Sequence, residues 1–147
     1  RDQGDTWSEP MMVAPPEVTE TGFPTIFAGD EGRVVVGYIG ENVDNGGWSG
    51  YMSVMTDAFA DNPLITTVAV NSADDPLDAT YDCGNVRCGG FGDFIDVEID
   101  DEGRPWIALA HNVNGELGIV GTYVYGPSLY GDLRLLPAIT AGGPETL

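Results

Sequence analysis

The feature that most restricts the fold of this chain is an internal repeat. Residues 23–38 align with residues 94–109, and both segments carry Asp-Glu-Gly-Arg between two strand-like runs. Glycine permits a positive φ in a tight turn, and the acidic side chains before it can accept hydrogen bonds from the turn backbone. Each copy is therefore predicted to form a β-hairpin.

The second copy has the period of a half-buried strand, because the apolar residues Ile95, Val97 and Ile99 alternate with acidic ones. Two further strand-like runs follow each hairpin, so we expect four strands per repeat. The predicted strands are 24–28, 33–39, 49–56 and 64–70 in the first unit, 93–99, 104–110, 117–125 and 130–137 in the second, and 7–13 ahead of both.

Four antiparallel strands per repeat, arranged radially, form a β-propeller blade, so the predicted fold class is all-β. At 147 residues the chain is one domain of about two blades and one outer strand, too few to close a propeller. We divide it into the end of a preceding blade and a linker (1–22), a blade (23–71), an inter-blade loop (72–93), and a blade with a C-terminal tail (94–147). A β-sandwich with two similar hairpins is the alternative.

The charge balance excludes one class of partner. The chain has 24 acidic residues against five arginines and no lysine, and its net charge is −19. Such a surface repels nucleic acid and anionic membranes, because phosphate binding requires clustered Lys and Arg. The balance favours adaptation to a high-salt environment, where repulsion between carboxylates is screened; an ordinary acidic secreted protein and a calcium-loaded surface are the alternatives.

No segment approaches the roughly 20 apolar residues that cross a bilayer, so no membrane span is predicted. The opening residues, Arg1 to Gly4, are unlike a signal peptide. We therefore expect the chain to begin inside a longer precursor.

Cys83 and Cys88 lie in a glycine-bearing loop that can bring two thiols within bridging distance. A disulfide is favoured, which indicates an oxidising compartment. The alternatives are a zinc site, for which His111 is the only other soft ligand, and redox catalysis, for which the spacing differs from Cys-x-x-Cys.

Residues 2–7 read Asp-Gln-Gly-Asp-Thr-Trp and match the body of the Asp-box, also called the bacterial neuraminidase repeat. With the cysteine loop, the following Asp93-Phe94 and the second Asp-Glu-Gly-Arg, the chain resembles the sialidase-like propeller superfamily, in particular its secreted bacterial and archaeal members. The position of a second Asp-box, residues 56–61, lacks the Gly and the Trp. The resemblance implies a structural, non-catalytic role for Asp2, Gly4, Thr6 and Trp7.

In that superfamily, ligands meet the loops between strands two and three and the loops that join blades, whereas the first hairpin turns lie at the opposite end. The resemblance thus makes Arg33 and Arg104 turn-stabilising residues. The binding face would include Asp44, Trp48, His111 and Asn112. His111 follows an apolar strand and has a simpler interpretation as a strand-end residue.

A sialidase of this superfamily grips the substrate carboxylate with three arginines, attacks with a tyrosine activated by a glutamate, and protonates with an aspartic acid. Candidates for these roles are Tyr81, Arg87, Asp93 and Glu41, none of which lies in an identifying signature. Simpler roles are available: Arg87 can neutralise its acidic neighbours, Tyr81 can pack over the cysteine loop, and Asp93 can cap its strand. No cofactor is implied, although calcium is an option at Asp74, Asp75, Asp78 and Asp82.

Two functions follow. The first is an extracellular or cell-surface propeller module for binding or assembly, with no complete active site in this chain. The alternative is part of an exo-sialidase-like glycoside hydrolase whose catalytic residues lie mostly on other blades. The expected partners are the remaining blades, from the same precursor or another chain, and a glycan or protein ligand. Fold similarity does not decide between the two functions.

Overall fold

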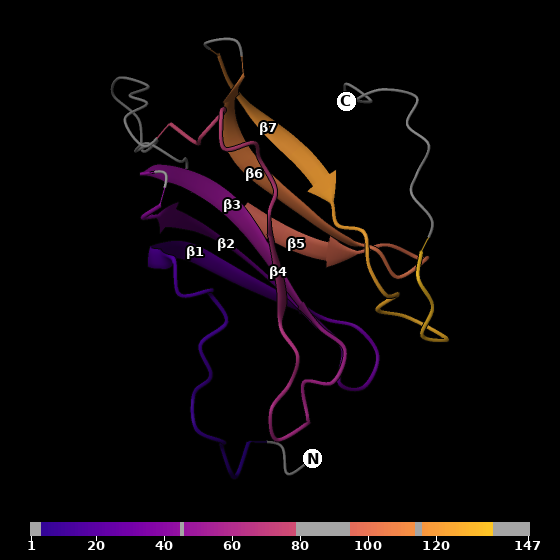
Figure 1. Cartoon of the computed structure of the whole chain (residues 1–147). Helices are drawn as coiled ribbons and strands as arrows, with labels where there is room; N and C mark the ends of the chain where they lie inside the picture. Colours follow the sequence, from indigo (N-terminus) through magenta and orange to yellow (C-terminus); the bar gives the residue numbers. More distant parts are fainter. Residues whose placement is uncertain (1–3, 45, 79–94, 114–115, 137–147) are drawn as a thin grey trace.

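A computed structural model describes residues 4–44, 46–78, 95–113 and 116–136. These residues contain strands and turns and no helix, which confirms the all-β class. The strands form two antiparallel sheets, in the orders β1-β2-β3-β4 and β5-β6-β7 (Figure 1). Each sheet is a meander, because strands that are neighbours in the chain are also neighbours in the sheet.

The strands largely follow the predicted pattern. They are β1 (Val18–Ala28), β2 (Val34–Asn42), β3 (Gly47–Met55), β4 (Thr66–Ala69), β5 (Ile95–Ile99), β6 (Pro105–Val113) and β7 (Glu116–Tyr123). The main difference is β1, which begins at residue 18 rather than 24. Its register shifts between Gly22 and Thr25, where Phe23 has a φ of 51°. This irregularity breaks the alternation by which a strand is found in a sequence.

Two predicted strands are wrong. Residues 7–13 form no strand; Pro10 has no N–H for a ladder, and the Trp7 side chain is 89% exposed. Residues 130–136, the described part of the predicted strand 130–137, form a loop in which one bridge joins Pro127 and Leu135. The leucines of this loop have a strand-like spacing, but its polar groups bond to one another and to the hairpin turns instead of to a neighbouring strand.

The hairpin turns show that the repeat is structural. The N–H of Gly29 bonds to the Arg33 carbonyl at 2.9 Å, and at the equivalent position of the second copy the N–H of Asp100 bonds to the Arg104 carbonyl at the same distance. The turn glycines have φ values of 77° at Gly32 and 89° at Gly103, a conformation that favours glycine. Both predicted hairpins are confirmed.

The repeat also includes the segment after the third strand of each unit. The N–H of Ala58 bonds to the Gly32 carbonyl at 2.9 Å, and the N–H of Leu129 bonds to the Gly103 carbonyl at 2.8 Å. Ala58 and Leu129 occupy equivalent positions in the two copies, although the residues around them differ. Each unit therefore returns to its own hairpin turn in the same way.

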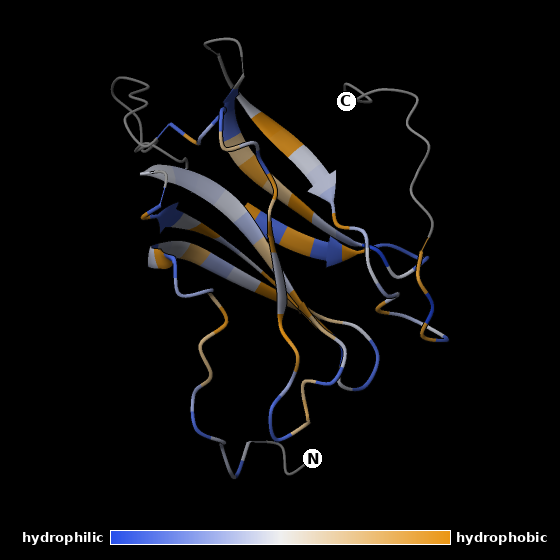
Figure 2. Cartoon of the chain, in the orientation of Figure 1, coloured by the Kyte–Doolittle hydropathy of each residue, from blue (hydrophilic) through white to orange (hydrophobic). Residues whose placement is uncertain are grey.

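The two sheets pack face to face around one core. Val35, Ile39 and Met52 of the first sheet meet the second sheet's buried residues Val97, Ile99, Ile107 and Leu109. Gly37 and Gly50 make this close approach possible, since a Cβ at either position would overlap Val97 or Leu109. Figure 2 shows the alternation along β5, whose apolar side chains enter the core while Asp96 and Glu98 stay exposed.

The strands of the two sheets approach most closely where β5 lies against β1 and β2. The Thr25 hydroxyl donates to the Asp96 carboxylate at 3.1 Å across this contact. The first strands of the two units are therefore neighbours in space.

A second, smaller cluster lies on the opposite side of the first sheet. Val18, Tyr38 and Tyr51 are buried there, with Val13 and Ala14 packed against them. The rings of Tyr38 and Tyr51 stack with centroids 5.5 Å apart. The Tyr38 hydroxyl lies 3.2 Å from the hydroxyl of Ser53, and burial raises the pKa of Tyr38 above its ordinary value.

Candidate functional site

The end of the molecule opposite the hairpin turns is formed by the β2–β3 loop (43–46), residues 71–78 after β4, and the end of β6. We call it the loop end. The Asn42 side chain accepts the N–H of Asp44 at 2.9 Å, and its carbonyl accepts the N–H of Gly46 at 2.8 Å. This local turn leaves Asp44 exposed beside Glu41 and Trp48, which face each other on β2 and β3.

Hydrogen bonds of the Asn71 side chain join residues 71–78 to β3. Its side-chain oxygen accepts the N–H of Gly50 at 2.8 Å, and its side-chain nitrogen donates to the carbonyl of Asp75 at 2.9 Å. The N–H of Leu77 then bonds to the Trp48 carbonyl at 2.8 Å. Asn71 was not among the predicted site residues, although an Asn ahead of Ser-Ala-Asp-Asp is a signal for a side-chain-stabilised turn.

Two polar contacts join the same segment to β6. The His111 Nε2 lies 3.3 Å from the Asp75 carboxylate, and the Asn112 amide donates to Asp78 at 3.4 Å. His111 is only 6% exposed, and its Nδ1 has no hydrogen-bond partner among the described residues. The structure thus brings together two predicted binding residues, His111 and Asn112, with two predicted calcium ligands, Asp75 and Asp78.

The described charged side chains of this loop cluster are acidic. They are Glu41, Asp44, Asp74, Asp75 and Asp78, and His111 lies beside Asp75. The three described arginines, Arg33, Arg104 and Arg134, lie instead at the end that holds the hairpin turns. The field at the described loop end therefore disfavours anionic ligands.

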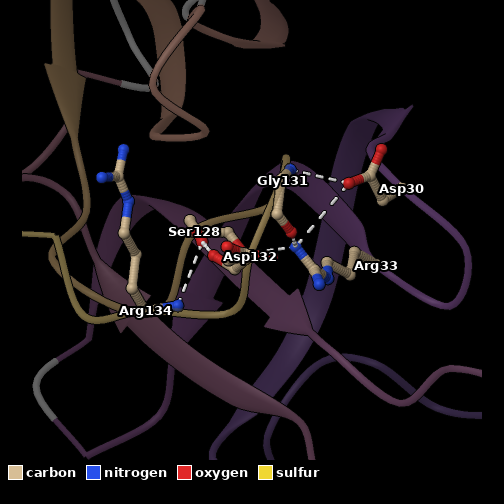
Figure 3. Close-up of polar contacts among 6 residues, drawn as sticks. All are labelled: Asp30, Arg33, Ser128, Gly131, Asp132 and Arg134. Carbon is tan, nitrogen blue, oxygen red and sulfur yellow. Dashed lines mark hydrogen bonds and ion pairs between the residues drawn. The ribbon is translucent and has the colours of Figure 1, made fainter.

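At the turn end, residues 128–134 close a loop against the first hairpin (Figure 3). Arg33 donates to the Gly131 carbonyl at 2.8 Å, and the N–H of Gly131 donates to the Asp30 carboxylate at 2.7 Å. Buried Ser128 donates its hydroxyl proton to the Asp132 carbonyl at 2.8 Å. Arg33 thus joins the loop 128–134 to the first hairpin, and its contact within the turn is an ion pair with Asp30 at 3.9 Å.

Arg104 has contacts within its own turn, the second hairpin turn. It forms ion pairs with Asp100 at 3.5 Å and Glu102 at 2.5 Å. Burial by itself would raise the pKa of Asp100, but hydrogen bonds from the Trp106 indole and from the N–H groups of Arg104 and Glu102, together with the Arg104 charge, hold that pKa below its ordinary value.

Several predicted residues lie outside the described part of the chain, so the structure places none of their side chains. They are Asp2 of the Asp-box, both cysteines (Cys83 and Cys88), Asp82 of the calcium set, and the catalytic candidates Tyr81, Arg87 and Asp93. Within the described part of the Asp-box, Gly4 has a φ of 95° and Thr6 lies in a bend.

Neither of two small cavities is lined by the described loop-end residues. One, of about 300 Å³, lies between residues 68–70 and residues 122–125. The other, of about 220 Å³, lies at the turn end and is lined by Asp101, Glu102, Tyr130, Gly131, Asp132 and Arg134. No three His, Cys, Asp or Glu side chains in the described ranges are placed to hold a metal ion. The same ranges contain no helix that could span a membrane.

Comparisons with protein-family models, with curated proteins and with solved structures find no match to this chain.

Proposed function

We propose that this chain is a two-blade segment of a sialidase-like β-propeller and serves a secreted protein as a binding and assembly module. The observation that carries the proposal is the repetition of one folded unit along the chain. Its hairpin and the segment returning to it recur with matching hydrogen bonds. Consecutive strands within each sheet also favour blades over a sandwich, whose connections commonly pass from one sheet to the other.

Two local features support the sialidase-like type. Residues 2–7 have the Asp-box sequence, and residues 56–65 lie between the third and fourth strands of a meander. In the latter segment the Asp57 carboxylate accepts the N–H of Leu64 at 3.1 Å. This is a carboxylate-to-backbone bond across a loop, and it is similar in kind to the backbone bonds that the motif assigns to its aspartate.

The charges of the described loop end favour a module over a complete sialidase. Recognition of a substrate carboxylate needs cations, and the described loop end offers acidic groups and His111. The ligand proposed for this end is therefore a neutral glycan or a basic protein segment. A catalytic role would depend on Tyr81, Arg87 and Asp93 and on residues of other blades.

Purified protein should be tested at low and at high salt with a fluorogenic sialoside and with arrays of neutral glycans and basic peptides, because high salt screens attraction between the acidic loop end and a basic peptide. We expect no sialoside turnover, and binding that weakens at least tenfold when Asp44 and Asp74 are both changed to Ala. The matched control changes Glu31 and Asp101, exposed acids of the hairpin turns, to Ala and should bind like the unmodified chain. Sialoside turnover by this chain would overturn the module function.

A further inference from the structure

The contact between the two sheets is head to tail. The side of the first sheet that carries Gly37 and Gly50 meets the side of the second sheet that carries Val97 and Leu109. In the alignment of the two copies, Ala108 and Gly121 correspond to the two glycines, whereas Ile26 and Tyr38 correspond to Val97 and Leu109. Each sheet therefore has one face with small central residues and one face with large apolar side chains. The contact inside the chain joins the small-residue face of the first sheet to the large-residue face of the second.

The face of the second sheet that points away from this contact carries small residues at its centre. We call it the Trp106 face, comprising Trp106, Ala108, Gly121 and Tyr123. Ala108 and Gly121 oppose each other on β6 and β7, and both are exposed. The rings of Trp106 and Tyr123 stand next to them with centroids 4.8 Å apart. Ala108 has one methyl group more than its counterpart Gly37.

The opposite face of the first sheet, which Val13 and Ala14 cover in part, presents the matching apolar side chains near the hairpin turn. We call it the Ile26 face, comprising Ile26, Ala28 and Val36. Ile26 is 68% exposed and lies opposite Val36 in the register. Their counterparts in the second copy are Val97 and Ile107, the two side chains that fill the space above Gly37.

We propose that the occupant of the Trp106 face is the Ile26 face of a second copy of this chain, with Ile26 and Val36 seated over Ala108. This docking rests on the proposed function, because it repeats the contact between blades. Val13, Ala14 and partly buried Val36 pack against Tyr38 and Tyr51, so the contact uses exposed Ile26 and Ala28 and the accessible part of Val36. A head-to-tail contact of this kind closes into a ring when its rotation divides a full turn.

The net charge predicts how the association depends on salt. Each copy carries a charge of −19, and Asp96 and Glu98 lie on the same side of the second sheet as the Trp106 face. Repulsion between copies is screened within about 3 Å at 1 M salt, compared with about 10 Å at 0.1 M. Assembly should therefore be stronger at high salt.

Sedimentation velocity and native mass spectrometry should be run on the unmodified chain, on Ile26→Arg and on Ala108→Arg. The unmodified chain should assemble as salt rises, and each variant alone should remain monomeric. An equal mixture of the two variants should form a one-to-one heterodimer, because each variant retains the face that the other has lost. Leu64→Arg adds the same charge at an exposed site on neither face and should assemble normally.

An unmodified chain that stays monomeric at every salt concentration would overturn the docking proposal, as would a variant mixture that stays monomeric. If the chain paired only with flanking blades of a longer parent protein, the Trp106 and Ile26 faces would belong to contacts with those blades. That result would also overturn the docking proposal. Far-UV circular dichroism establishes that each variant is folded. Ligand binding by a monomer would leave the proposed module function intact, whereas an assembled chain that binds neither ligand class would count against that function alone.

Discussion

Asp100 shows how single side chains fix the turns of this protein. One of its carboxylate oxygens accepts the N–H groups of Glu102 and Arg104, and the other accepts the Trp106 indole. The Asp-Glu-Gly-Arg pattern predicted the turn because its chemistry is local. The link to Trp106 was not predicted, since it depends on which side of β6 the indole occupies.

Replacing Asp100 with Asn should lower the free energy of unfolding by about 1–2 kcal/mol at neutral pH, because hydrogen bonds to a charged acceptor are lost. The folded-state pKa of Asp100 lies below the ordinary aspartate value near 4, so the stabilisation is present above that value and is lost as pH falls through the lower folded-state pKa. Urea titrations from pH 7 to pH 2.5 measure the difference, and Asp101→Asn is the matched control. A constant difference across this range would contradict the assignment.

Replacing Asn71 with Ala should release residues 71–78 from β3, because the Gly50 N–H loses its acceptor. The expected cost is about 1–3 kcal/mol for a buried donor left unsatisfied. Hydrogen exchange should accelerate at Gly50 and across residues 72–77. Asn62→Ala, at an exposed position of another loop, should leave exchange at these positions unchanged; equal acceleration by both variants would argue against the role of Asn71.

At the scale of elements, the structural repeat extends beyond the residues that match in sequence. The matching residues cover the hairpin, whereas the matching hydrogen bonds also include the returns at Ala58 and Leu129. The described residues of the predicted strand 130–137 belong to this returning segment and form a loop instead of a strand. The sequence predicted an extended run, but Ser128 and Asp132 close a loop that bonds to the first hairpin.

The glycines between the sheets give a prediction at this scale. Gly37→Ala should destabilise the fold by about 1–3 kcal/mol, because the new methyl group would overlap Val97 in a packed core. Adding Val97→Ala should cost less in the Gly37→Ala background than in the unmodified chain, since it removes the overlap. Gly118→Ala is the matched control, since a Cβ there meets nothing within 4 Å. Thermal unfolding of the four variants measures these effects, and additive costs would contradict the contact.

At the scale of the whole molecule, a charge of −19 on 147 residues opposes compaction. The described arginines offset little of the repulsion between acidic side chains at the loop end, because their contacts lie at the turn end. The free energy of unfolding should therefore depend on the salt concentration as well as on the packing of the core.

The melting temperature should rise steadily as sodium chloride increases from 0.05 M to 2 M, by about 5–10 °C if screening contributes 1–2 kcal/mol. Calorimetry measures this, with the potassium salt as a control for ion identity. A melting temperature that is flat or falls with salt would contradict adaptation to high salt. A separate rise with millimolar calcium at fixed ionic strength would instead support the calcium alternative.

The sequence by itself determined the class of the fold, the two hairpins and the approximate strands, because turn chemistry and apolar alternation act over a few residues. It also determined the acidic surface. Only the tertiary structure decided that His111 meets Asp75, that Asn71 holds the loop to β3, and that residues 128–134 fold onto a hairpin. These contacts join residues distant in sequence, and they form only after the sheets have packed and fixed which side chains face one another.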